Sequence, residues 1–253
     1  MLATTLTGPA TDTPPLLIAH GLFGSARNWN VIAKRLSDRG QVISVDMRNH
    51  GRSPRSPSQS YADMAADLAE VIAAHGGRAD ILGHSMGGKA AMVLALGHPG
   101  LLRRLIVADI APVAYGHSQS HLIEAMRSVD LSRITTRRDA DTQLAGTIAE
   151  TGVRAFLLQS LDVKEKRWRL NLDVLEADMD QITGWPEGIS GRFAGPTLML
   201  SGAVSDYVLP AHRAIIRSHF PAARFAKIPG AGHWLHADRP RAFEAAVRVF
   251  LDA

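Results

Sequence analysis

The stretch ADILGHSMGGKA, residues 79–90, decides the fold of this 253-residue chain. Ala79, Ile81 and Leu82 predict a short buried strand, and residues 88–96 predict a helix. Between them, GHSMG matches the pattern G-x-S-x-G with Ser85 at its centre. A strand, a sharp turn and a helix form the context in which such a turn exposes a nucleophilic serine above a sheet. We therefore predict that Ser85 is a nucleophile.

The segments on either side of this stretch alternate between strands and helices. Strands are predicted at residues 2–7, 16–19, 42–45, 105–108, 197–200 and 224–228. The run from Leu16 to Ala19 is continuously apolar, as in a parallel strand buried on both faces. Apolar residues recur at helical spacing between Tyr61 and Ile72 and again in the last fourteen residues. The pattern predicts an α/β fold, with a mostly parallel central sheet and helices on both faces.

Residues 112–185 interrupt this alternation. Helical patterns are predicted around residues 122–129, 138–148, 153–161 and 168–179, and no strand is predicted among them. We interpret this segment as a helical cap inserted between two strands of the sheet and projecting over the strand ends. The expected division is a core of residues 1–111 and 186–253 and a cap of residues 112–185.

Composition excludes several classes of protein. The chain has no cysteine, so disulfides, thiolate metal sites and a cysteine nucleophile are excluded. Its net charge of +4 comes from scattered basic residues, whereas a nucleic-acid-binding face needs a dense basic patch. No apolar run approaches the roughly 20 residues that a membrane helix needs, and the N-terminus does not resemble a signal peptide. We expect a cytoplasmic protein with no nucleic-acid or membrane partner.

A serine nucleophile needs a base, and the base needs an orienting acid. The candidate base is His233, in a glycine-rich loop after the last predicted strand, with His236 a weaker alternative. Two aspartates follow strands at the same edge of the sheet, and Asp109 is preferred over Asp206 as the acid. The backbone N–H groups of Met86 and Leu22 are the candidate oxyanion donors.

Five blocks of sequence carry a resemblance to a known family: HGLFGS (20–25), DMRNHGRS (46–53), GHSMGGKAAM (83–92), ADIAPV (108–113) and GAGHWLHADRP (230–240). Together they resemble the YbfF-type esterases of the α/β-hydrolase superfamily. The resemblance implies an α/β-hydrolase fold and serine carboxylesterase or thioesterase activity on small acyl esters, with no metal and no organic cofactor. It carries over Ser85 as nucleophile, His233 as base and Asp109 as acid. It also implies that Ser205 is an auxiliary contact of the histidine, although this chain places the second acid, Asp206, directly after it.

The substrate and the reaction leave alternatives open. The apolar candidates for a substrate pocket, besides Met86, are Phe23, Met126, Trp168, Trp185 and Trp234. A carbon–carbon hydrolase or a perhydrolase can share the same fold and triad, and an inactive relative can serve as a binding module. The sequence does not define the acyl chain, the leaving group or the oligomeric state.

Overall fold

Seven strands form the central sheet of this computed structural model, which describes all residues 1–253. The strands are β1 (Ala3–Thr7), β2 (Leu16–Ala19), β3 (Val42–Asp46), β4 (Ala79–His84), β5 (Leu102–Ala108), β8 (Thr197–Gly202) and β9 (Ala223–Ile228). Their order across the sheet is β1-β3-β2-β4-β5-β8-β9, and only β1 runs antiparallel to its neighbour. The predicted mostly parallel sheet is confirmed. Because β2, β4 and β5 are adjacent and parallel, the turns that follow them meet at one edge.

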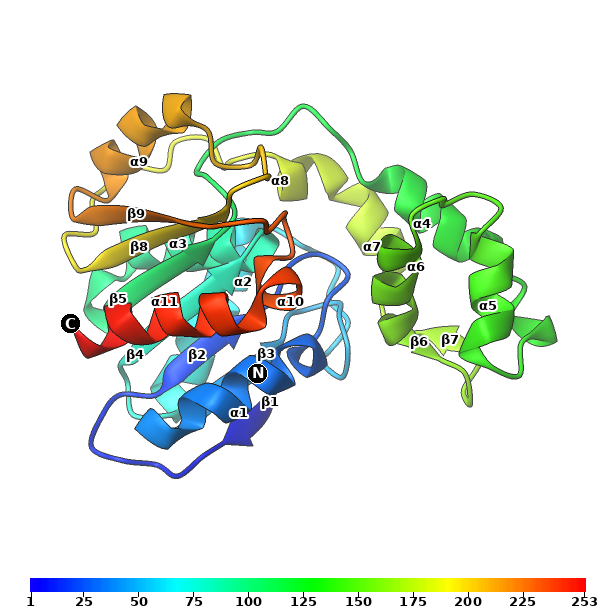
Figure 1. Ribbon diagram of the computed structural model, residues 1–253, viewed down its shortest axis with the longest axis horizontal. Helices are drawn as coiled ribbons and strands as arrows, with labels where there is room; N and C mark the ends of the chain where they lie inside the picture. Colours follow the sequence, from blue (N-terminus) through cyan, green and yellow to red (C-terminus); the bar gives the residue numbers. More distant parts are fainter.

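Helices cover both faces of this sheet (Figure 1). One face carries α1 (Asn30–Leu36), α10 (Leu235–Asp238) and α11 (Pro240–Asp252), and the other carries α2 (Tyr61–Ala74), α3 (Met86–Gly97) and α9 (Arg213–His219). Short 3-10 helices also occur along the chain: η1 (Ala26–Trp29), η2 (Ser37–Arg39), η3 (Pro99–Leu101), η4 (Leu131–Arg133), η5 (Leu158–Ser160) and η6 (Pro210–His212). The longest helix, α2, has 14 residues, and no helix has the length and apolar character needed to cross a bilayer.

The helical periodicity of the sequence predicts which side chains face the sheet. In α11, Phe243, Val247, Phe250 and Leu251 are buried, as the sequence pattern indicates. Burying an apolar side chain of this size contributes roughly 1.5–3 kcal/mol. The start of α2 is also set by a signal in the local sequence, since the Ser60 side chain accepts a hydrogen bond from the backbone N–H of Asp63 and so caps the helix. These helices therefore form where the chain carries both an apolar stripe and an end signal.

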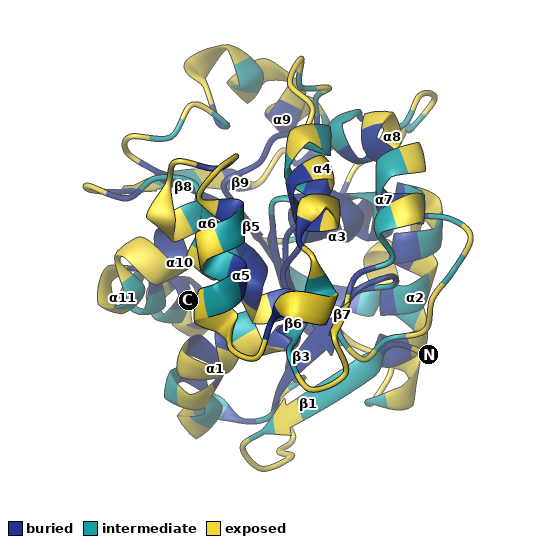
Figure 2. Cartoon of the chain, turned by 90° about the vertical axis from the view of Figure 1, so that its right-hand side faces the viewer, coloured by how far each residue is buried: buried dark blue, intermediate teal, exposed yellow.

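The segment between β5 and β8 lies beside the carboxyl ends of the strands (Figures 1 and 2). It contains α4 (Ser120–Ser128), α5 (Arg137–Leu144), α6 (Thr151–Leu157), α7 (Leu172–Ala177) and α8 (Met179–Thr183). It also contains a small antiparallel hairpin of β6 (Leu161–Asp162) and β7 (Arg167–Trp168). The prediction that this segment has no strand, with a helix starting at Trp168, is therefore wrong. Two residues per strand are too few to produce a readable alternation of apolar and polar residues.

Candidate active site

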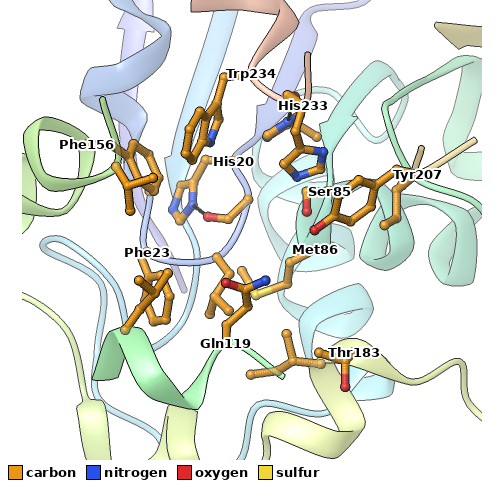
Figure 3. A pocket seen from close by; sticks show the side chains of 18 of the residues that line it. His20, Phe23, Ser85, Met86, Gln119, Phe156, Thr183, Tyr207, His233 and Trp234 are labelled. Carbon is orange, nitrogen blue, oxygen red and sulfur yellow. Dashed lines mark hydrogen bonds between the residues drawn. The ribbon is translucent and has the colours of Figure 1, made fainter. Parts of the chain in front are cut away.

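Ser85 lies in the sharp turn between β4 and α3, with backbone angles φ 51° and ψ −120°. This conformation is unfavourable for a residue with a side chain, so the surrounding contacts must hold it. A Cβ atom added to Gly83 would lie 2.3 Å from the carbonyl oxygen of Gly87, and one added to Gly87 would lie 2.4 Å from that of Ala19. Both positions therefore require glycine. The Ser85 side chain does not cap α3 and lines a cavity (Figure 3).

The imidazole of His233 and the carboxylate of Asp109 are in contact. His233 Nδ1 lies 2.8 Å from Asp109 Oδ2. The carboxylate is fully buried, and it also accepts hydrogen bonds from the Gly202 N–H at 2.9 Å and from Ser205 Oγ at 2.5 Å. Because a carboxylate can only accept a hydrogen bond, Nδ1 of His233 carries a proton. In the neutral ring Nε2 is then unprotonated and is free to accept one. The pair can therefore hold the tautomer that takes a proton from a serine.

The alternative acid, Asp206, does not meet His233. It is exposed in the turn after β8, whereas the neighbouring Ser205 hydroxyl donates to Asp109. Two sequence-based predictions are corrected here. Asp206 is no alternative partner for the histidine, and Ser205 contacts the acid rather than the histidine. The reason is the path of the turn, which directs Ser205 toward the buried carboxylate and leaves Asp206 in solvent.

Tyr207, which the sequence reasoning missed, follows these two residues and packs on the histidine. Its ring is stacked on the His233 imidazole, with centroids 3.9 Å apart and planes inclined by 22° (Figure 3). The Tyr207 hydroxyl lies 2.9 Å from Nε2 of His117, which precedes α4 in the inserted segment. The one feature of the sequence that indicates a place near the site is that Tyr207 directly follows the two candidate residues Ser205 and Asp206. This stacking restrains the ring plane of His233.

The two candidate oxyanion donors border the same cavity as Ser85. Met86 is the first residue of α3, so its N–H has no partner within the helix. Leu22 lies in the loop after β2, next to Phe23, which has a left-handed backbone with φ 62°. The site therefore provides a strained serine, an oriented histidine and two backbone donors around one space.

Four buried histidines lie close to this site. Burial lowers the pKa of His50 and of His236 to about 3, and it also lowers those of His20 and His84. His236 is stacked on Trp29 with centroids 4.1 Å apart, and its Nδ1 has no hydrogen-bond partner. Because no carboxylate orients it, His236 lacks what a base needs.

The cavity has a volume of about 510 Å³ and lies between the sheet edge and the inserted segment. Phe23 and Trp234 line it, together with apolar residues that the sequence analysis did not name: Ile110, Tyr115, Leu122, Ile148, Val153, Phe156 and Ile182. Met126, Trp168 and Trp185 do not line it, which corrects the prediction for these three. Met126 and Trp168 are buried against each other, with the indole N–H donating to the Met126 carbonyl at 2.9 Å. Trp185 packs toward His219 on the core side.

Lys89 is a buried lysine that lines this cavity, and sequence reasoning missed it. It lies four residues after Ser85 on α3, a spacing that places both on one helix face. Its ammonium donates to the carbonyls of Thr183, at 2.8 Å, and Gly184, and burial lowers its pKa to about 7. Lys89 therefore holds the point where the inserted segment returns to the core. No three histidine or acidic side chains converge as metal ligands would.

Comparisons with known proteins agree with this geometry. A family model described as alpha/beta hydrolase fold matches residues 14–240. The chain is 43% identical to the sn-1-specific diacylglycerol lipase ABHD11 of Mus musculus, over 97% of this chain and 83% of that protein. It is 40% identical to Esterase YbfF of Escherichia coli, over 95% of this chain and 94% of that protein. Among solved structures, a marine microorganism esterase superposes with a TM-score of 0.92 at 40% identity, covering 99% of this chain and all of that one.

Proposed function

This chain belongs to the alpha/beta-hydrolase fold family and is a serine hydrolase of ester bonds, and we propose that Ser85, His233 and Asp109 carry the reaction. The observation that carries this proposal is the 2.8 Å contact between His233 and the buried Asp109, beside the strained Ser85. The esterase and lipase relatives favour ester hydrolysis over carbon–carbon hydrolysis, perhydrolysis or an inactive binding role.

The first half of the reaction forms an acyl-serine. His233 Nε2 takes the hydroxyl proton of Ser85 as Oγ attacks the ester carbonyl carbon, and Asp109 stabilises the imidazolium that results. The carbonyl oxygen becomes an oxyanion that accepts hydrogen bonds from the Leu22 and Met86 N–H groups. As the intermediate collapses, the bond from carbon to the leaving oxygen breaks, and His233 returns the proton to the departing alkoxide.

The second half releases the acid. A water molecule gives a proton to His233 and attacks the acyl carbon, forming a second oxyanion in the same hole. The carbon–Oγ bond then breaks, and the proton on His233 returns to Ser85. No step consumes a cofactor, because proton transfer and oxyanion stabilisation use only side chains and backbone groups of this chain.

The substrate we propose is a small carboxylic ester with an apolar acyl or alkyl group. Its acyl side would contact Phe23, Phe156 and Trp234, which line the cavity. We further propose that residues 112–185 act as a cap, supported by the cavity-lining residues that α4 and α6 contribute. Three expectations from the sequence stay predictions: activity on thioesters, a cytoplasmic location, and the lack of membrane or nucleic-acid partners.

Replacing the nucleophile tests this proposal. Ser85→Ala is expected to lower kcat on a p-nitrophenyl ester by about three or more orders of magnitude, because the proposed acyl intermediate forms on Ser85 Oγ. The circular dichroism spectrum and the thermal midpoint should stay close to wild type, since Ser85 caps no helix. Hydrolysis at a near-normal rate by a folded Ser85→Ala protein would sink the assignment.

A further inference from the structure

The loop that follows β2 is held by two histidines that the reaction does not use. The Phe23 N–H donates to His50 Nε2 at 3.1 Å. The Gly21 carbonyl accepts from His20 Nδ1 at 2.8 Å and from the Gly24 N–H at 3.0 Å. These bonds occupy the N–H groups of Phe23 and Gly24 and leave the Leu22 N–H without an acceptor in the protein. Among the N–H groups of Leu22, Phe23 and Gly24, the one at Leu22 is therefore available to a bound substrate.

The hydrogen bonds of His50 also define its tautomer. Its Nδ1 lies 2.8 Å from the carbonyl oxygen of Arg48, so Nδ1 carries the proton. The unprotonated Nε2 is then the acceptor that the Phe23 N–H requires. The side chain is 1% exposed and has no alternative partner in solvent. The position of His50 therefore serves to hold one backbone donor of the loop.

A residue of the inserted segment holds the other side of Phe23. Ser160, at the end of η5, donates its hydroxyl to the Phe23 carbonyl at 2.8 Å. Phe23 has φ 62°, a left-handed conformation that costs energy for a residue with a side chain and persists only where its surroundings impose it. His50 and Ser160 bind the two peptide groups that flank this strained residue, and so they fix the direction of the preceding Leu22 N–H.

The same part of the inserted segment also braces the His50 loop. The Gly51 N–H donates to the Arg169 carbonyl at 2.8 Å, and the Asn171 N–H donates to the Asn49 carbonyl at 2.9 Å. Between these two bonds, His50 forms an isolated bridge with Leu170. Residues 160–171 therefore touch the oxyanion loop directly, through Ser160, and indirectly, through His50.

We propose that His50 and Ser160 are positioning residues that hold the loop 21–24 so that the Leu22 N–H faces the oxyanion, and that docking of residues 160–171 completes the oxyanion hole. This inference rests on the proposed function, in which Leu22 donates to the oxyanion. Under it, the cap acts on the chemical step as well as on substrate choice.

The test compares Ser160→Ala, His50→Gln and His50→Ala with a control, Gln159→Ala. Gln159 is the neighbour of Ser160 and bonds Asn28 Nδ2 at 2.7 Å, so the control also loses a contact between cap and core but leaves the loop 21–24 untouched. For each variant, kcat and KM are measured on one p-nitrophenyl ester. The inhibition constant is measured for a trifluoromethyl ketone, whose adduct places an oxyanion in the hole. Thermal unfolding checks that each variant is folded.

Loss of a whole oxyanion donor costs about 10²–10³ in kcat, so a misplaced donor should cost less. We expect Ser160→Ala to lower kcat about tenfold and His50→Ala somewhat more, with KM within about twofold and the inhibition constant rising in proportion. Because the Gln side chain can still accept from the Phe23 N–H, His50→Gln should recover part of the loss. Gln159→Ala should match wild type.

The inference is overturned if folded Ser160→Ala and His50→Ala keep wild-type kcat and wild-type affinity for the ketone. It is also overturned if they lower only the thermal midpoint, or if Gln159→Ala loses as much activity as Ser160→Ala. Should His50→Ala fail to fold, Ser160→Ala decides the question alone. Failure of the proposed function has a different signature, because Ser85→Ala would then stay active and the ketone would not inhibit the wild-type protein.

Discussion

Backbone strain in this molecule is concentrated at single residues around the site. Five residues other than glycine have a positive φ, and four of them are Phe23, Asn49, Ser85 and Asp109. Such conformations cost of the order of 1–3 kcal/mol each and persist only where neighbouring contacts impose them. Here they lie at the proposed nucleophile, at the proposed acid, in the loop 21–24 and in the loop that carries His50. The strain at Ser85 could be predicted from its motif, but the other three could not, since nothing local in the sequence marks them.

At the residue scale, the choice between two aspartates gives the sharpest prediction. Asp109→Asn should lower kcat by about 10⁴-fold, because an amide cannot hold the required histidine tautomer or stabilise the imidazolium. Asp206→Asn should leave kcat within about twofold, because Asp206 is exposed and a surface substitution away from special contacts has small effects. Both values are measured on one ester at one pH, with folding verified for each variant.

The matched pair separates catalysis from general damage. Both substitutions are Asp to Asn, and both residues follow a strand of the sheet. A large loss at Asp206 together with a small loss at Asp109 would contradict the assigned acid. Equal losses at both positions would indicate an effect on the fold around Ser205 rather than on His233.

At the scale of elements, the inserted segment divides its apolar residues between its own core and the cavity. Met126 in α4 is fully buried away from the cavity, whereas Phe156 in α6 lines the cavity and packs near Trp234 with centroids 5.3 Å apart. Composition could not separate the two groups, because apolar residues at helical spacing suit either role. Which face of a short helix meets the sheet edge depends on how the helices dock, and docking is tertiary information.

This division predicts which substitutions change substrate preference. Phe156→Ala should lower the ratio of kcat/KM for p-nitrophenyl octanoate to kcat/KM for p-nitrophenyl acetate about fivefold. This is the effect of losing roughly 1 kcal/mol of apolar contact with the longer chain. Met126→Ala should leave that ratio unchanged and destabilise the protein by about 2–5 kcal/mol, as a cavity in a packed core does. If Met126→Ala changed the ratio and Phe156→Ala did not, the described cavity would not be the acyl site.

At the scale of the whole molecule, the sheet and its helices could be predicted because each signal is local. Buried strands appear as apolar runs such as Leu16 to Ala19, and α11 appears as an apolar stripe. The site needed the sheet order, which places the turns after β2, β4 and β5 side by side. The hairpin β6-β7 and the contact of Ser205 with Asp109 depend on packing between distant segments, so no local sequence pattern predicts them.

The buried histidines make the stability of the whole molecule depend on pH. His50 and His236 have folded-state pKa values of about 3, below the 6.5 of an unfolded histidine. The unfolded chain therefore binds more protons between pH 3 and pH 6.5, so stability is lost as the pH falls below 6.5. Each group contributes a slope of up to roughly 1.4 kcal/mol per pH unit.

Urea unfolding at a series of pH values between 7.5 and 4.5 measures this dependence. The free energy of unfolding should fall steeply below pH 6.5. His236→Phe should reduce its slope against pH by the contribution of about one proton, up to roughly 1.4 kcal/mol per pH unit, because it removes one buried titrating group. His236 serves well here because its ring is stacked on Trp29, a contact that phenylalanine can keep. A slope in His236→Phe equal to that of the wild-type protein would contradict the account.

The central claim is that Ser85 is the nucleophile activated by His233, and covalent labelling tests it most directly. The wild-type protein is treated with a p-nitrophenyl alkylphosphonate, which a nucleophilic serine attacks as it attacks an ester, and intact mass and peptide mapping follow. The account predicts one phosphonate per chain, located on Ser85, with activity lost in proportion to labelling and no label on Ser85→Ala. Complete inactivation with Ser85 unmodified, or equal labelling of Ser85→Ala, would contradict it.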